Sequence, residues 1–238
     1  MSYFSYLIAL NKQHTNYDLH LVIVFMSLAA AIIASIGVSS ALFAQVQQMQ
    51  TSIFTIRPDI LGDYMNSPLA VVFNLSLLAA GVCFLLGTLA IYFTFSDVLS
   101  RGIAVVGGIV GLSIALMGMF PINFLELHRK VSTLYLVGSL VLHCLCFADY
   151  FKPKSTMTRV VFGLSIVAIV TSVNLIRLLD WHLLDFPSCD DNGSHFCWVS
   201  SSMWLLTQTN ILWCVCLGLS IRQHIVVQQS LSRHVVPA

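Results

Sequence analysis

Six long apolar runs dominate this sequence and restrict its fold more than any other feature. They lie near residues 21–44, 69–95, 102–120, 131–151, 159–179 and 199–221. The hydrocarbon core of a bilayer is about 30 Å thick, so a helix needs about 20 apolar residues to cross it. None of the runs shows the alternating pattern of a membrane barrel strand. The sequence therefore predicts six membrane-spanning helices, each with its backbone polar groups bonded internally.

The composition agrees with a membrane protein and excludes the soluble classes. Apolar residues make up 58% of the 238 residues, and charged residues only 9%. Soluble domains carry about 45–50% apolar and about 25% charged residues. No basic tract is present that could bind nucleic acid. We expect an all-α fold, a six-helix transmembrane bundle that forms one integral domain over residues 1–238, with the lipid bilayer as a partner and nucleic acid excluded.

The distribution of lysine and arginine predicts the orientation of the bundle, because cytoplasmic segments carry an excess of both. With the amino terminus inside, the inner segments hold seven such residues and the outer segments four. Cys189 and Cys197 then fall in the last outer loop, where an oxidising compartment permits a disulfide. We expect Cys189 to pair with Cys197 and both termini to be cytoplasmic. If the protein is prokaryotic, we expect the bundle to lie in the plasma (inner) membrane.

Small residues in the 102–120 span predict close helix packing. Gly107 and Gly111 form a G-x-x-x-G pattern, and Gly118 continues the stripe. Small side chains let helix backbones approach closely in lipid, so we expect this span to be the central one. Polar side chains inside the spans should face protein rather than lipid, namely Asn74, Ser76, Asn174, Gln208 and Asn210. His143 lies deep in a span, and we expect it to be neutral and bonded to a neighbouring helix.

The turn after this span carries signals for a helix end and a helix start. Pro121 restrains the residue before it from the helical region and so ends the helix. Asn123 and Glu126 have the three-residue spacing of a capping box. We expect them to start the next helix, which places His128 in its second turn near the outer border of the bilayer.

Polar residues gather at the predicted outer border of the bundle. The first outer loop carries Arg57-Pro58-Asp59, and Asp185 follows the fifth span. The candidate ligand-binding residues at this border are Asn74, His128, Arg129, Arg177, Asp180 and His182. Arg177 and Asp180 are three residues apart, so on a helix they share a face and can pair. Two interpretations of these border residues are open. One is that they snorkel to water or cap helices at the interface. The other is that they line a recessed polar pocket that binds a head group or a peptide.

The sequence contains no established catalytic or cofactor-binding pattern. It lacks paired histidines at membrane depth for haem, an intramembrane H-x-x-x-H for zinc and a G-x-S-x-G nucleophile. Residues two apart on a helix point about 200° apart, so the C-x-C pairs Cys144/Cys146 and Cys214/Cys216 cannot chelate an ion. We expect no cofactor and no metal, and we assign no catalytic residue.

Two short segments resemble a known membrane family. Phe73-Asn74-Leu75-Ser76, followed by Gly81, opens the second span, and Gly118-x-Phe120-Pro121 precedes His128. Over residues 59–149 the chain is similar to a six-helix prokaryotic membrane family of unknown function, which distantly resembles the Frag/DRAM/Sfk proteins. The resemblance implies a membrane factor connected with lipid remodelling. The residues that it singles out are Asn74, Gly118, Pro121 and His128.

Three functions remain open at this point. The first is a non-enzymatic membrane protein that binds a lipid head group or a partner protein through its polar outer face. The second is a lipid-modifying enzyme with His128 as general acid or base and Asp180 as its orienting partner, which requires hydrogen-bond reach between them. The third is a small-solute transporter, for which the polar residues of the last span give thin support and for which no internal repeat is found.

Overall fold

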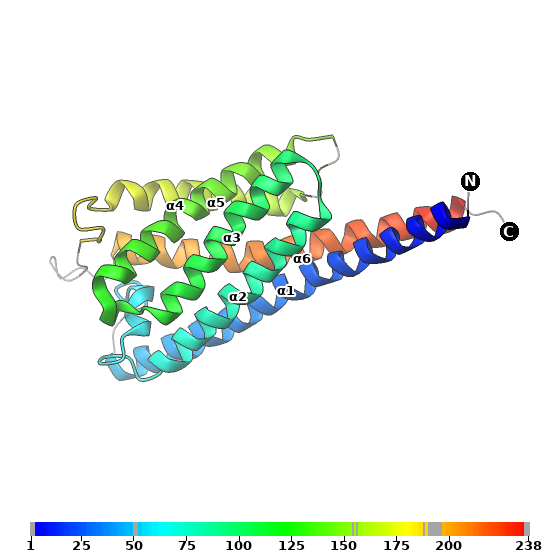
Figure 1. The fold of residues 1–238 in the computed structure, drawn as a ribbon. Helices are drawn as coiled ribbons and strands as arrows, with labels where there is room; N and C mark the ends of the chain where they lie inside the picture. Colours follow the sequence, from blue (N-terminus) through cyan, green and yellow to red (C-terminus); the bar gives the residue numbers. More distant parts are fainter. Residues whose placement is uncertain are drawn as a thin grey trace.

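The computed structural model describes residues 3–49, 52–153, 155, 157–187, 189 and 197–235. Within these residues the chain is helical and contains no β-strand (Figure 1). The six long helices are α1 (Tyr3–Met49), α2 (Ala70–Thr94), α3 (Val98–Met119), α4 (Leu125–Tyr150), α5 (Arg159–Leu178) and α6 (Trp198–Val235). Two short 3₁₀ helices lie in the connections, η1 (Pro58–Gly62) and η2 (Ile122–Phe124).

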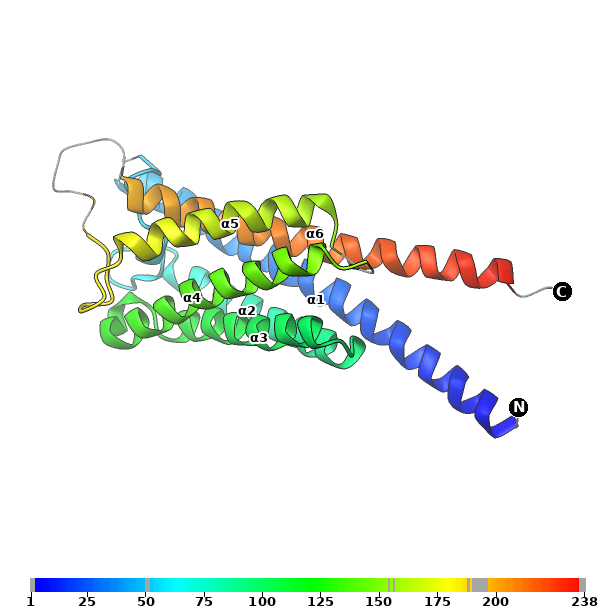
Figure 2. The same cartoon turned by 90° about the horizontal axis from the view of Figure 1, so that it is seen from above.

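Each predicted span corresponds to one long helix, which confirms the prediction of an all-α protein with six membrane-competent helices. The segments long and apolar enough to cross a membrane are Asp18–Met49, Ala70–Thr94, Val98–Met119, Ile122–Tyr150, Arg159–Leu178 and Trp198–Gln223. The start of α1 and the end of α6 both project beyond the bundle at the same end (Figures 1 and 2). The end of α5 and the start of α6 lie at the opposite end (Figure 1).

The helices form a closed ring rather than a bundle around a central helix. Each helix packs chiefly against its neighbours in the sequence, and α6 packs back on α1 to close the ring. α3 contacts α2 on one side and α4 on the other, so the prediction that it is the central helix is wrong. Its glycines mark a close pairwise contact. No helix in the described part of the chain occupies the middle of the ring, so side chains from all six long helices point into it.

Glycines bring α2 and α3 into backbone contact. The glycines of α3 that border α2 are Gly107, Gly108, Gly111 and Gly118. A Cβ atom added at Gly118 would lie 2.4 Å from the Asn74 carbonyl oxygen on α2. From the α2 side, a Cβ atom at Gly81 would lie 2.4 Å from the Ala115 backbone nitrogen. Neither separation is possible for a larger residue without a shift of the helices, so the small residues set this spacing.

Most polar side chains within the spans face the protein interior, as predicted. Asn74 and Ser76 are buried, and Asn174 and Asn210 donate hydrogen bonds to other helices. Gln208 is exposed, so the prediction is wrong for this residue. It lies two positions from Asn210 on the same helix and therefore points about 200° away, towards the outer surface. That surface is otherwise apolar, and examples exposed by 63% to 69% are Phe25, Ile36, Phe43 and Val170.

The predicted capping box at the start of α4 is not formed. The helix begins at Leu125, and no side chain caps it. Asn123 lies in η2, where its side chain accepts from the Tyr64 backbone N–H at 3.0 Å and donates to the Asp63 carboxylate at 2.8 Å. Glu126 pairs with a lysine one turn later, at 2.7 Å. A tertiary contact thus replaces the local cap and ties the α3–α4 turn to the loop before α2.

Candidate functional site

A cavity of about 240 Å³ lies in the middle of the helix ring. All six long helices contribute to its wall, which is mostly apolar, with residues such as Ala30, Phe84, Val110, Leu175 and Leu206. Two groups of polar side chains interrupt this wall. We call the first the arginine network, and it consists of Arg57, Asp59, Arg129 and Asp185. We call the second the Asn210 network, and it consists of Tyr135, Ser139, His143 and Asn210.

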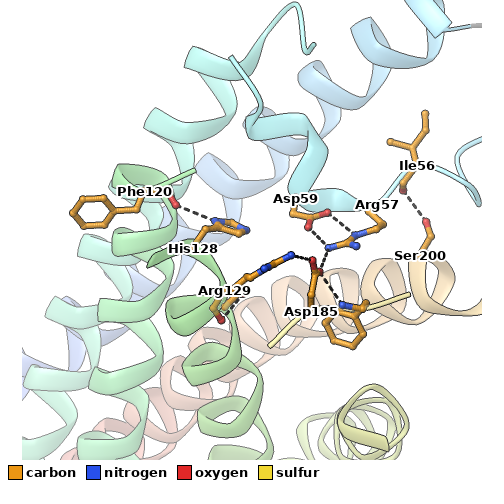
Figure 3. Close-up of polar contacts among 10 residues, drawn as sticks. Ile56, Arg57, Asp59, Phe120, His128, Arg129, Asp185 and Ser200 are labelled. Atoms are coloured by element: carbon orange, nitrogen blue, oxygen red, sulfur yellow. Dashed lines mark hydrogen bonds and ion pairs between the residues drawn. The ribbon is translucent and has the colours of Figure 1, made fainter. Parts of the chain in front are cut away.

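The arginine network joins three separate parts of the chain. Arg57, in the loop before η1, places Nη2 2.5 Å from Asp59 Oδ2 and 3.3 Å from Asp185 Oδ1. Arg129, on α4, pairs with the other oxygen of Asp185 (Figure 3). The four side chains are only 15% to 26% exposed. The attraction between the charges of such half-buried pairs is stronger than between charges on an open surface. Asp185 pairs with both arginines and therefore holds Arg57 and Arg129 together.

The charges of this network shift the pKa values of its members. Burial acts to raise the pKa of Asp185, but hydrogen bonds from the Phe186 backbone and Arg129, with the charges of Arg57 and Arg129, outweigh it. The pKa of Asp185 is therefore lowered from its ordinary value. Burial acts to lower the pKa of Arg57, and the charges and hydrogen bonds of Asp59 and Asp185 overcome it and raise the pKa. Asp185 and Arg57 are therefore both expected to be charged near neutral pH.

Helix α6 fixes the position of Arg57. The carbonyl oxygen of Ile56, the residue before Arg57, accepts a hydrogen bond from the Ser200 hydroxyl at 2.7 Å. It accepts a second from Trp204 Nε1 at 2.8 Å. Figure 3 shows the first of these bonds beside the arginine network. Both donors lie in the first two turns of α6, so the last helix holds the first connecting loop in place.

The segment after α5 positions Asp185. The Asp180 backbone N–H donates to the Asp185 carbonyl oxygen at 2.9 Å and closes a tight reversal. Leu184, inside this reversal, has a φ of 51°, a left-handed conformation that is costly for a leucine. Cys189 and Cys197 are disulfide-bonded, with Cα atoms 5.4 Å apart, as predicted. The bond ties this segment to the start of α6.

Three of the six candidate ligand-binding residues line the cavity. Asn74 Nδ2 donates to the Gly62 carbonyl at 3.0 Å, while its buried Oδ1 has no partner among the described residues. His128 is bonded through Nδ1 to the Phe120 carbonyl at 2.9 Å (Figure 3), so Nδ1 donates and Nε2 is the ring nitrogen left for a ligand. The buried Nε of Arg129 also lacks a partner in the described part of the chain. These three residues therefore offer a ligand one guanidinium N–H donor, one amide oxygen and one imidazole nitrogen.

The other three candidates, Arg177, Asp180 and His182, are exposed and do not line the cavity. Asp180 accepts from the His182 backbone N–H at 2.8 Å and so stabilises the turn after α5. No ion pair joins Arg177 to Asp180 in the residues that the structure describes. The reason is that α5 ends at Leu178, so Asp180 has already left the helical face that Arg177 occupies.

The Asn210 network lies deeper, between α4 and α6. Asn210 Nδ2 donates to the Tyr135 hydroxyl at 2.6 Å and to the Ser139 hydroxyl at 3.3 Å. Asn210 Oδ1 is bonded to His143 Nε2 at 2.8 Å across the ring, and His143 Nδ1 bonds to Ser165 Oγ on α5 at 3.4 Å, which confirms that His143 bonds to a neighbouring helix. The His143 ring also meets Trp213 edge to face at 5.2 Å. Trp213 in turn donates from Nε1 to the Ser165 hydroxyl at 3.1 Å.

Sequence reasoning missed several cavity residues. Arg57, Asp59 and Asp185 were recognised as border residues but not as members of one site, because no local pattern shows which border residues converge. Tyr135 and Ser139 were overlooked, although a signal exists. Tyr135, Ser139 and His143 recur every fourth residue and so form a polar stripe along one face of α4.

Within the described ranges, no three His, Cys, Asp or Glu side chains lie close enough together to hold a metal ion. The two C-x-C pairs are free thiols, with Cys146 and Cys214 buried and Cys144 exposed. Comparison of the chain with protein-family models, curated proteins and solved structures finds no match.

Proposed function

We propose that this protein is a non-enzymatic multi-pass membrane protein that binds a lipid-like ligand in the cavity of its helix ring. The observation that carries the proposal is an apolar cavity with two arginine side chains at one end. Binding sites for small molecules are mostly apolar, with a few polar groups that fix the orientation of the ligand. A ligand with an apolar chain and an anionic head fits this cavity, because its chain can contact the apolar wall and its head can contact the arginines at the end.

The volume of the cavity favours a slender ligand. An engineered protein cavity of about 150 Å³ binds benzene, and pockets for drug-sized ligands start near about 300 Å³. A cavity of about 240 Å³ lies between the two and suits part of one acyl chain better than two chains. The lining residues Arg129 and His143 are about 21 Å apart along α4, at about 1.5 Å per residue. This length agrees with an extended chain.

Arg129 is the residue that we expect to contact the head of the ligand. Its Nη2 is held by Asp185, whereas its Nε is buried without a partner in the described residues. A carboxylate or phosphate oxygen can therefore bind Nε without breaking the ion pair. The planar guanidinium suits both groups better than an ammonium does.

We also propose that the arginine network faces a non-cytoplasmic compartment and that both termini are cytoplasmic. The disulfide between Cys189 and Cys197 supports this orientation, because disulfides persist in oxidising compartments. The excess of lysine and arginine in the segments at the opposite end also supports it. The ligand would then enter from the outer leaflet or from the outer aqueous phase.

The lipid-modifying alternative has weaker support. It requires His128 and Asp180 to lie within about 2.6–3.2 Å of each other or to share one water. His128 is instead bonded to the Phe120 carbonyl in the wall of the cavity, whereas Asp180 is exposed and bonded to the turn after α5. The two side chains serve separate local structures, so we favour binding without chemistry.

Native mass spectrometry of the protein extracted in mild detergent tests the proposal. We expect a bound single-chain anionic lipid on the wild type and a loss of most of it in Arg129→Gln. A hydrogen bond to a charged group contributes about 1.5–3 kcal/mol, which corresponds to roughly 10- to 100-fold in affinity. Arg177→Gln is the matched control, since Arg177 is exposed and lies outside the cavity. Equal adducts in the two variants, or no adduct on the wild type, would contradict the proposal.

A further inference from the structure

The hydrogen-bond roles within the Asn210 network leave two donors unused. The Asn210 amide nitrogen donates to Tyr135 at 2.6 Å and to Ser139 at 3.3 Å, so both hydroxyl oxygens act as acceptors towards it. His143 Nε2 lies 2.8 Å from the amide oxygen, so with the amide in this orientation His143 carries its ring hydrogen on Nε2 and donates it to Asn210 Oδ1. Each hydroxyl also has one hydrogen to donate. Those two hydrogens cannot point at Asn210.

Neither hydrogen finds an acceptor in the described part of the protein. The Tyr135 and Ser139 hydroxyls make no hydrogen bond other than those from Asn210. This differs from Ser113 and Ser165, whose hydroxyls donate to backbone carbonyls one turn earlier. A donor left unsatisfied in an apolar environment is costly. Both residues line the cavity, so an acceptor located in the cavity can satisfy them.

We propose that the Tyr135 and Ser139 hydroxyls form an inner subsite that binds the ester carbonyl oxygen of a single-chain acylated phospholipid whose anionic head is held at Arg129. This inference rests on the proposed function and names its ligand class. A carbonyl oxygen has two lone pairs, so it can accept from both hydroxyls at once. Tyr135 lies six residues beyond Arg129 on α4, about 9 Å along the helix axis. A glycerol backbone between head and ester fills a gap of that order.

The surroundings of the inner subsite favour a neutral acceptor over a second charge. The cavity residues within one helical turn of Ser139 and Asn210 include Leu142, Ile211 and Trp213; the first two are apolar, and Trp213 already donates to Ser165. No lysine or arginine lines this part of the cavity. A charged oxygen here would lack a counter-ion at membrane depth, which is expensive. A carbonyl gains two hydrogen bonds without that cost.

The test compares two lysophosphatidic acids of equal chain length, one with an ester-linked chain and one with an ether-linked chain that lacks the carbonyl. Their competition for the purified full-length protein is measured by native mass spectrometry. One neutral hydrogen bond is worth about fivefold in affinity, so two predict a preference for the ester of about 5- to 30-fold. In the double variant Tyr135→Phe with Ser139→Ala, the preference should fall to within about twofold. Binding of the ether lipid should change little.

Tyr92→Phe is the control, because Tyr92 is exposed on α2 and does not line the cavity. Its preference for the ester should match that of the wild type. If neither lipid binds the wild type, both this inference and the proposed function fail. If the two lipids bind the wild type equally well, the inner subsite is refuted while the proposed function stands. The same holds if the double variant keeps the preference for the ester.

Discussion

Replacing Asn210 by leucine removes three hydrogen bonds in one step while roughly keeping the volume of the side chain. The lost bonds are those with Tyr135, Ser139 and His143. Interhelical hydrogen bonds in membrane proteins contribute about 0.6 kcal/mol each on average and about 1.7 kcal/mol at most. Asn210→Leu should therefore lower the free energy of unfolding by about 2 kcal/mol, with an upper bound near about 5 kcal/mol. Unfolding in mixed micelles by sodium dodecyl sulfate titration measures this change.

Gln208→Leu is the matched control on the same helix. Gln208 is exposed and has no hydrogen bond in the described residues, so its replacement places an apolar side chain towards lipid. We expect a neutral or slightly stabilising effect. A double-mutant cycle between Asn210→Leu and Tyr135→Phe should give a coupling energy of about 0.6–1.7 kcal/mol. Equal destabilisation by the two leucine variants, or a coupling energy of zero, would refute the reasoning.

Three further predictions follow from other parts of the molecule. Gly118→Ala forces a Cβ atom against the α2 backbone and should cost about 1–3 kcal/mol in unfolding free energy, whereas Gly163→Ala, with open space around it, should be neutral or stabilising. The pKa of Asp185 is lowered in the folded protein, so its ionised carboxylate stabilises the fold at pH values above its ordinary pKa of 3.8. This contribution is lost as the pH falls through the lowered pKa of the folded protein. Melting curves should therefore show the gap between wild type and Asp185→Asn narrowing below about pH 4; a constant gap would contradict this. A membrane-impermeant maleimide should label Cys189 and Cys197 in intact cells only after mild reduction, and labelling from the cytoplasmic side would reverse the proposed orientation.

The membrane spans were predictable because apolar length is a local property of the chain. The bond between His143 and a neighbouring helix was predictable for a related reason, since a polar group at membrane depth must find a protein partner. The pairing of Arg177 with Asp180 was not, because it depended on whether α5 continues past Leu178. A difference of two residues at a helix end moves a side chain to another face, and such ends are the least certain part of a prediction. The resemblance to the Frag/DRAM/Sfk proteins stays a prediction.

The arginine network could not be predicted from the sequence. Arg57, Arg129 and Asp185 lie in three different parts of the chain, and their meeting depends on the Ile56 contact with α6 and on the reversal after α5. These are tertiary contacts with no periodic signal. The capping box failed for the same reason, since Asn123 found partners in a distant loop. The polar stripe on α4 could be found from the spacing of its residues in the sequence. That it faces the cavity could be known only from the arrangement of the six helices in a ring.

The two hydrogen bonds that α6 donates to Ile56 have a consequence for biosynthesis. Ser200 follows its acceptor by 144 residues. At about 5–20 residues per second, a ribosome takes roughly 7–30 s to make that stretch. During this time the first loop and Arg57 lack the hydrogen bonds from α6 that hold them in the folded protein. The cavity therefore assembles only when the last helix is released, and a chain that stops before it would leave the loop unattached and the ring open.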